Sequence, residues 1–203
     1  MIYQLHEFQK TVMAPAVVWA DTAKHLFTNP FSPLAYTPAS RTIAANNEMF
    51  VRLLRRYPKP QWEIEDTVVD GDRVAVTPEV VVDKPFCHLL HFRKEVAVEQ
   101  PKLLIVAPLS GHFATLLRET VRTVLPDHDV WITDWVDAKM VPLASGAFHL
   151  DDYVDYVREF VRFLSPDLSV MSVCQPTVPV LAAISLMAAD NDPALPKAMI
   201  MMG

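Results

Sequence analysis

Glycine and cysteine are scarce in this chain of 203 residues, and long apolar runs and clusters of basic residues are missing. The apolar runs are far shorter than the roughly 20 residues of a membrane-spanning helix, so we expect no membrane span. A net charge of −6 without a basic run argues against nucleic acid as a partner. The N-terminus lacks the charged-then-apolar pattern of a signal peptide, which predicts a cytoplasmic protein.

The two cysteines, Cys87 and Cys174, are typical of a reducing compartment, and nothing in the sequence supports a disulfide between them. Cys87 is followed by His88 and, three residues later, by His91, a spacing that invites comparison with a metal site. The two histidines would point to opposite faces of a strand, however. With no second ligand cluster, the sequence predicts no metal, and it predicts no cofactor.

About half of the residues, 51%, are apolar, which is enough for a hydrophobic core. Residues 1–62 are predicted to be an N-terminal helical segment. Its first helix reaches about residue 30 and is kinked or split at Pro15, and its second runs from Thr37, as N-cap, to Tyr57. Proline at 58 and 60 closes that helix.

Residues 63–203 change in character and predict an α/β domain. Asp70-Gly71 is a favourable hairpin turn between the first two strands. Beyond residue 100, strands alternate with helices, which predicts a doubly wound, mostly parallel sheet. The expected strands are 65–69, 73–82, 86–92, 102–107, 130–133, 168–173 and 197–202, and the expected helices are 114–125, 151–164 and 175–189. Because the last apolar strand runs into the end of the chain, we expect the sheet to be incomplete at its C-terminus.

The stretch from Leu168 to Ala183 reads as a buried strand, an abrupt turn carrying Cys174, and a helix with Pro176 in its first turn. A strand, a nucleophile and a helix in this order form the nucleophile elbow of α/β-hydrolases, written G-x-S-x-G. Here the serine is replaced by cysteine, and Ser172 and Pro176 stand where the glycines would be. The positive end of a helix dipole favours a thiolate. The alternative, an unreactive cysteine at a strand end, stays open.

An oxyanion hole is expected from two places. One donor is the backbone N–H of Gln175, directly after the nucleophile, and the other comes from the loop after the strand 102–107. In that loop Ser110 and Gly111 can present N–H groups, and His112 can line the site together with Pro176. The alternative is an ordinary strand-to-helix turn capped by Ser110.

The catalytic acid and base are not expected within this chain. In α/β-hydrolases the chain order is nucleophile, acid, histidine, whereas all seven histidines precede Cys174. Asp190 and Asp192 follow it too closely to be the triad acid. Three residues in and directly after the strand 130–133 are expected mainly to pack in the core, with a role at the rim of the site also open: Trp131, Asp134 and Trp135.

Several stretches together resemble the intracellular polyhydroxyalkanoate (poly-3-hydroxybutyrate) depolymerases: 106–118, 129–135, 148–153, 173–179 and, ahead of them, 85–93. The resemblance covers nearly the whole chain, and the cysteine box with Pro176 is fairly specific to that family. It implies an α/β-hydrolase that cleaves ester bonds of amorphous polyester on cytoplasmic granules, with Cys174 as nucleophile. It also implies that the triad aspartate and histidine belong to a later part of the family's length. A chain ending at Gly203 would then be inactive alone.

The expected chemistry is a thioester on Cys174, stabilised by N–H groups of Gln175 and the Ser110-Gly111 loop and then hydrolysed by water. Three alternatives stay open. A polyhydroxyalkanoate synthase-like acyltransferase shares the cysteine but has glycines at the positions of Ser172 and Pro176. A non-catalytic granule-binding protein would suit a natural end at Gly203. A generic serine esterase lacks its serine here.

Overall fold

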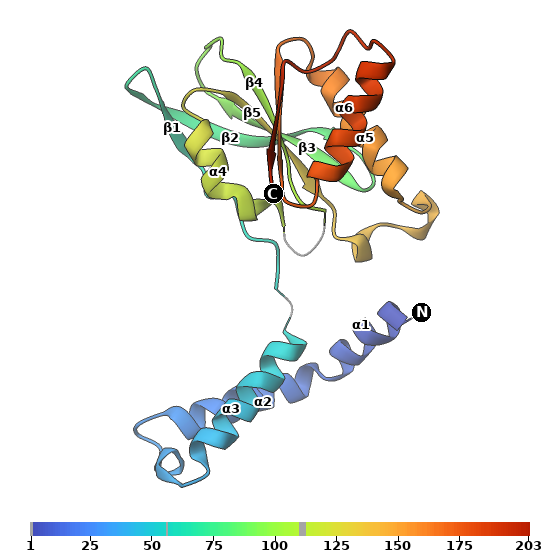
Figure 1. Cartoon of the computed structure of the whole chain (residues 1–203). Coiled ribbons are helices and arrows are strands. Elements are labelled where there is room, and N and C mark those ends of the chain that lie inside the picture. Colours follow the sequence, from blue (N-terminus) through green and yellow to red (C-terminus); the bar gives the residue numbers. More distant parts are fainter. Residues whose placement is uncertain (1, 56, 110–112) are drawn as a thin grey trace. The chain divides into compact units, whose positions relative to one another are not determined.

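The computed structural model describes residues 2–55, 57–109 and 113–203, and the chain divides into two compact units, Met1–Pro58 and Lys59–Gly203. The sequence-based boundary after residue 62 falls a few residues into the second unit. The first unit is helical, and the second contains the sheet (Figure 1).

The helices of the first unit are α1 (Ile2–Val12), α2 (Ala14–Thr28), the 3-10 helix η1 (Pro33–Tyr36) and α3 (Ser40–Leu54). The predicted split at Pro15 is confirmed, because α2 begins at Ala14 with the proline in its first turn, where no N–H is needed. Helices α2 and α3 pack against each other, and Lys24 Nζ lies 2.8 Å from Glu48 Oε2 across their contact.

The predicted start of the second long helix at Thr37 is wrong, because α3 begins at Ser40. Thr37 instead closes η1: its backbone N–H and its hydroxyl donate to the Leu34 carbonyl at 3.3 and 2.9 Å. The predicted end at Tyr57 is also too late, since α3 ends at Leu54. Tyr57 precedes Pro58, and the residue before a proline avoids the helical region.

The second unit is built on a seven-stranded sheet in the order β1-β2-β3-β5-β4-β6-β7 (Figure 1). The pairs β1–β2, β2–β3 and β3–β5 are antiparallel, whereas β5, β4, β6 and β7 form a parallel block. The strands are β1 (Asp66–Val69), β2 (Asp72–Asp83), β3 (Cys87–Lys94), β4 (Lys102–Val106), β5 (Asp129–Trp135), β6 (Leu168–Val173) and β7 (Ala198–Met202). The predicted α/β class is therefore confirmed.

The predicted hairpin turn between β1 and β2 is present at Asp70 and Gly71, whose φ angles are +51° and +93°. Positive φ at both central residues gives the strand twist that a two-residue hairpin requires, and glycine tolerates it at no steric cost. The turn explains why one of the few glycines of this chain stands here.

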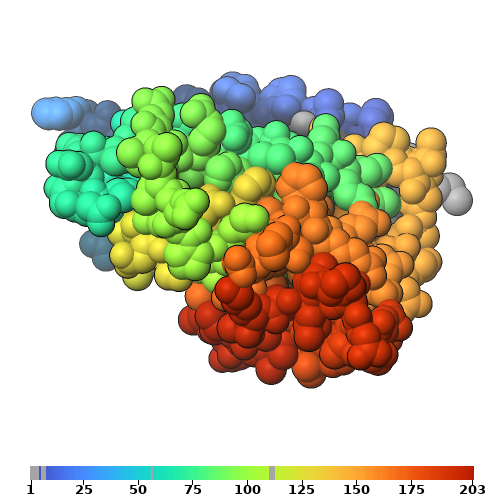
Figure 2. Space-filling view, turned by 90° about the horizontal axis from the view of Figure 1, so that it is seen from above, coloured from blue at the N-terminus to red at the C-terminus, as the bar shows by residue number. Residues whose placement is uncertain are grey.

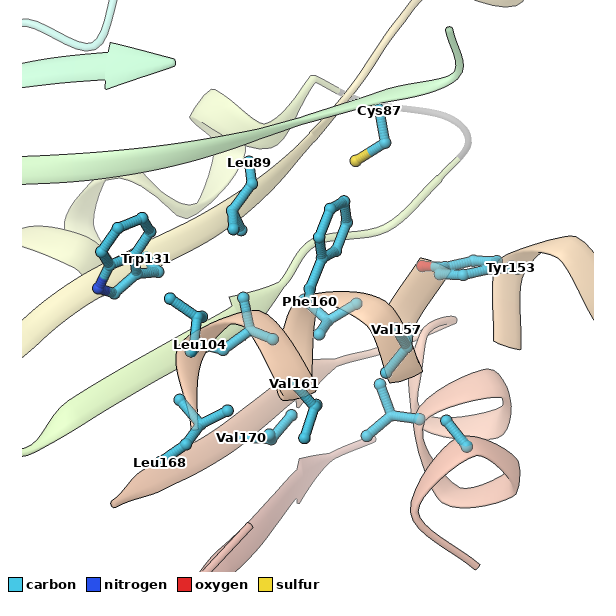
Figure 3. Close-up of a cluster of buried hydrophobic side chains, with 14 of the residues drawn as sticks. Cys87, Leu89, Leu104, Trp131, Tyr153, Val157, Phe160, Val161, Leu168 and Val170 are labelled. Atoms are coloured by element: carbon cyan, nitrogen blue, oxygen red, sulfur yellow. The ribbon is translucent and has the colours of Figure 1, made fainter. Parts of the chain in front are cut away.

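Helices cover both faces of the sheet, as a doubly wound arrangement requires (Figure 1). On one face lie α5 (Leu150–Leu164) and α6 (Thr177–Ala189). Figure 3 shows Phe160 of α5 pointing toward Leu89 and Cys87 of β3, and Val161 of α5 beside Val170 of β6. On the other face lie the 3-10 helix η2 (Ala114–Leu117), α4 (Arg118–Val124) and the segment around Trp62. Two further 3-10 helices, η3 (Ala138–Met140) and η4 (Leu143–Ser145), lie between β5 and α5.

Strand β7 forms one edge of the sheet, next to β6. In Figure 2 the C-terminal segment, red, lies along one side of the molecule beside α5, orange. Within the described ranges, no helix is long and apolar enough to cross a membrane.

Candidate active site

Cys174 stands at the tip of a sharp turn between β6 and α6. Its φ is +67°, a left-handed value that costs a residue with a Cβ about 1–2 kcal/mol. Strain of this kind persists only where neighbouring bonds enforce it. Here the N–H of Cys174 donates to the Met202 carbonyl at 2.6 Å, and its carbonyl accepts from the N–H and the hydroxyl of Thr177 at 3.1 and 2.8 Å. The turn thus has elbow geometry without flanking glycines.

The strand and the helix on either side of the turn follow from their sequences. Side chains of β6 alternate between buried and half-buried, and Ser172 is fully buried, with its hydroxyl 3.4 Å from the Ile200 carbonyl of β7. Pro176 is buried and serves as the N-cap of α6, so the helix begins at Thr177, two residues after the predicted start at Gln175. Proline has no N–H to lose at this position.

The two cysteines lie in opposite environments, and both are free thiols. Cys174 is exposed. Cys87 is completely buried on the α5 side of the sheet, where Figure 3 shows it near Phe160. Burial, and secondarily the charge of Asp134, raises the pKa of the Cys87 thiol well above its usual value. Since the thiolate is the reactive form, Cys87 is a structural residue and Cys174 is the candidate nucleophile.

The loop after β4 is fastened at Ala107 by both of its backbone polar groups. The N–H of Ala107 donates to Thr133 Oγ1 at 2.9 Å. Its carbonyl accepts from Trp135 Nε1 at 2.9 Å and from the Tyr153 hydroxyl at 3.3 Å. Burial raises the pKa of Tyr153 far above its usual range, so its hydroxyl keeps the proton that this bond needs. The start of the loop is thus held by β5 and α5.

The same loop is also tied to the elbow. The N–H of Leu109 donates to Oε1 of Gln175 at 3.0 Å, across 66 positions of sequence. The loop after β4 and the elbow are thus joined at Leu109 and Gln175. The residues predicted in this loop as oxyanion donors, Ser110 and Gly111, and as site lining, His112, lie outside the described residues.

The three residues predicted at the end of β5 have different roles. Trp135 is in the core and donates to the loop, as described above, and its ring contacts Tyr153 at a centroid distance of 4.4 Å. Trp131 is also in the core and donates from Nε1 to Asp129 Oδ2 at 3.0 Å. Asp134 is buried and forms an ion pair with Lys59. Core packing is thus confirmed for both tryptophans, and Trp135 adds a contact with the loop.

An aspartate–histidine pair occurs in the sheet, but at the end of the strands opposite to the elbow. His91 Nε2 lies 2.6 Å from Asp129 Oδ1, and the His91 ring stacks on Trp131 at a centroid distance of 4.0 Å. Asp129 begins β5, whereas Cys174 follows the end of β6, and both strands run parallel to β4. The length of such a strand separates the His91–Asp129 pair from Cys174 by roughly 15–20 Å, so the pair cannot act as the base and acid for Cys174.

Among the described residues, no hydrogen bond joins an imidazole to Cys174, and no three histidine, cysteine or acidic side chains are grouped so as to hold a metal ion. His88 and His91 have separate partners, Asp83 at 3.1 Å and Asp129 at 2.6 Å. A triad acid and base for Cys174 are thus not provided by the described part of the chain.

A cavity of about 520 Å³ lies on the α4 face, between residues 59–65 and the side chains of Pro78, Leu90 and Asp134. Asp134 Oδ1 and Trp62 Nε1 are buried without a hydrogen-bond partner. Cys174 does not line this cavity, which is therefore separate from the elbow.

No protein-family model matches the chain, and no curated protein is significantly similar to it. Among solved structures, the chain is similar to that of the Francisella virulence factor BioJ, with 14% sequence identity and a TM-score of 0.39. The similarity covers 81% of this chain and 54% of the BioJ chain, so this chain spans about half of that protein's length. At this TM-score the likeness decides nothing about activity, which has to be argued from the geometry of the site.

Proposed function

We propose that Cys174 is the nucleophile of an α/β-hydrolase that cleaves the ester bonds of intracellular poly-3-hydroxybutyrate. The observation that carries the proposal is the backbone of Cys174, with φ of +67° between a buried strand and a helix and with the thiol exposed. In α/β-hydrolases the nucleophile occupies a strained strand-to-helix turn of this kind.

The place of the elbow in the sheet supports the proposal. The C-terminal ends of β4 and β6 lie side by side, since Val106 pairs with Ser172 in parallel register. In this fold the nucleophile follows one central strand and the second oxyanion donor follows its neighbour. The hydrogen bond from Leu109 to Gln175 joins these two loops.

The sequence favours a polyester substrate. The cysteine box 173–179 and the stretch 106–118 resemble the intracellular depolymerases that act on amorphous granules in the cytoplasm. Both stretches meet at the candidate site, through Gln175 and Leu109. The proposed setting is therefore the surface of a cytoplasmic polyester granule.

The proposed reaction begins with attack of the Cys174 thiolate on an ester carbonyl carbon. A C–S bond forms, the oxyanion accepts hydrogen bonds from backbone N–H groups, and the C–O bond to the next hydroxybutyrate unit breaks. The catalytic base takes the proton of the Cys174 thiol before the attack and gives it to the departing oxygen. Water then attacks the thioester carbonyl, the C–S bond breaks, and the carboxylic acid and the free thiol result. The resemblance places the base and its aspartate in a later part of the family's length, outside residues 1–203.

The experiment that tests the proposal uses p-nitrophenyl butyrate, an activated ester that needs no acid to assist its leaving group. We expect this chain to release about one equivalent of p-nitrophenolate as the thioester forms on Cys174. Cys174→Ala should abolish this release, and Cys87→Ala, which removes the buried thiol, should retain it. Release by Cys174→Ala at the unsubstituted rate would refute the assignment. The substrate is tested by release of hydroxybutyrate from amorphous granules by the natural full-length protein.

One observation favours a second candidate, a non-catalytic granule-binding protein. The first unit exposes large aromatic side chains, with Trp19 78%, Phe31 94% and Tyr36 75% accessible. Where such side chains form a contiguous patch, the patch is typical of surfaces that bind apolar material. Co-sedimentation with granules without any acylation of Cys174 would favour this candidate over the hydrolase.

A further inference from the structure

The side chain of Gln175 bridges the two loops of the candidate site. Its Oε1 accepts the N–H of Leu109 at 3.0 Å, while its backbone follows Cys174 directly and occupies the predicted oxyanion position. An amide oxygen is a neutral acceptor. A carboxylate in the same place would put a negative charge beside a developing oxyanion and oppose it.

In the described part of the loop, the bridge holds the residue that follows Ala107 and Pro108. Ala107 is fastened to Thr133, Trp135 and Tyr153. Pro108 has no N–H and cannot donate. Leu109 is thus the first residue after Ala107 with a backbone donor, and that donor is engaged by Gln175.

We propose that Gln175 is a positioning residue, whose side chain sets the loop after β4 at the distance from Cys174 that oxyanion stabilisation requires. The proposal rests on the proposed function, because an oxyanion forms only if Cys174 attacks a carbonyl group. The Leu109 N–H is used for the bridge, and the donors predicted from the sequence, Ser110 and Gly111, follow it in the chain. Gln175 then has two roles, one for its backbone N–H and one for its side chain.

The test compares two reactions of the same thiol. Acylation by p-nitrophenyl butyrate passes through an oxyanion: the C–S bond forms, the aryl C–O bond breaks and p-nitrophenolate leaves. Alkylation by iodoacetamide is a displacement at a saturated carbon, in which iodide leaves and no oxyanion forms. A positioning role changes the first rate without changing the second, whereas a general disturbance of the elbow changes both.

Gln175→Leu removes the acceptor and keeps a side chain of similar size. Loss of one oxyanion donor costs about 10²- to 10³-fold in rate, so a displaced loop should slow acylation by about tenfold or more. Alkylation should stay within about twofold of the unsubstituted chain. The matched control is Gln100→Leu, because Gln100 also bridges two segments, donating to the Pro126 carbonyl at 2.6 Å and accepting from Lys94, but before the start of β4. This control should leave both rates unchanged.

Three results would overturn the inference. Acylation of Gln175→Leu at the unsubstituted rate would mean that the bridge has no role, and faster acylation would mean that the side chain obstructs the site. An equal fall in acylation and alkylation would place the effect on the thiol rather than on the oxyanion loop. If the unsubstituted chain is alkylated at Cys174 but never acylated, the proposed function itself fails, and the inference fails with it.

Discussion

The left-handed backbone of Cys174 makes a prediction about stability that is independent of any substrate. At an ordinary position, a protein with glycine has a free energy of unfolding about 0.5–1 kcal/mol lower than the same protein with alanine, because glycine makes the unfolded chain more flexible. At a left-handed position a residue with a Cβ costs about 1–2 kcal/mol, and glycine avoids that cost. The φ of Cys174 is +67°, so the two effects oppose each other there and strain relief is the larger. Cys174→Gly should therefore be more stable than Cys174→Ala by about 0.5–1 kcal/mol.

The free energy of unfolding is to be measured for both variants by urea denaturation, followed by tryptophan fluorescence. Trp62, Trp131 and Trp135 belong to the second unit and are buried there, so their emission reports on the unit that contains the elbow. In a chain of this size the difference corresponds to a rise in melting temperature of about 1–4 °C.

The matched control is the same pair of substitutions at Val68, a half-exposed residue of β1 with extended backbone. There Val68→Gly should be the less stable variant by about 0.5–1 kcal/mol. The difference in free energy of unfolding between the glycine and the alanine variant should thus have opposite signs at the two positions. If glycine is as unfavourable at 174 as at 68, the elbow is not strained, and the main argument for Cys174 as a nucleophile is lost.

Three further predictions concern the surroundings of the elbow. Iodoacetamide should label Cys174 in the native chain and Cys87 only in denaturant, because burial hides that thiol and raises its pKa; equal native labelling, by peptide mass spectrometry, would contradict this. Tyr153→Phe removes a donor to the loop carbonyl and should lower the free energy of unfolding by about 0.5–1.5 kcal/mol, measured by urea denaturation. Burial is the largest single effect on Asp129 and opposes its ionisation. The hydrogen bonds from His91 and Trp131 and the nearby charges of His91 and Lys94 together outweigh burial, and the pKa of Asp129 is lowered. Its stabilising contribution is then present above about pH 4 and lost as the pH falls through the folded-state pKa, so the stability deficit of Asp129→Asn should shrink between pH 7 and pH 3.

Regular elements with a strong apolar pattern could be predicted closely from the sequence. The strand predicted at 168–173 is β6, and the helix predicted at 151–164 is α5, which begins one residue earlier at Leu150. Each of these elements buries one face or one stripe, and the spacing of its apolar residues fixes both its type and its extent. The order of strands and helices then gave the position of the elbow, although the five-residue motif itself matches poorly.

Helix ends were less predictable, because the same side chain has two local uses. The hydroxyl of Thr37 can cap the start of a helix or bond backwards to a carbonyl, and here it bonds to Leu34. The helix predicted over 114–125 likewise begins as the 3-10 turn η2 before α4. Nothing in the local sequence distinguishes these possibilities.

The side-chain partners of contacts between distant segments could not be predicted. Tyr153 lies on the buried side of its helix, but the partner of its hydroxyl depends on how α5 packs over β4 and β5. The contact between Gln175 and Leu109 depends on the register of β4 against β6. A search of the helix and strand ends for polar side chains would have singled out Gln175, but not its partner.

The hydrogen bonds around Cys174 also give β7 a part in the site. Without a glycine, the left-handed turn has to be held from outside, and one of the bonds that holds it joins the Cys174 N–H to the Met202 carbonyl at 2.6 Å. The other two come from Thr177 at the start of α6. If β7 were displaced from β6, the turn could relax to an ordinary φ and withdraw the thiol from its exposed position. The edge strand is therefore a structural requirement of the elbow, as much as α6 is.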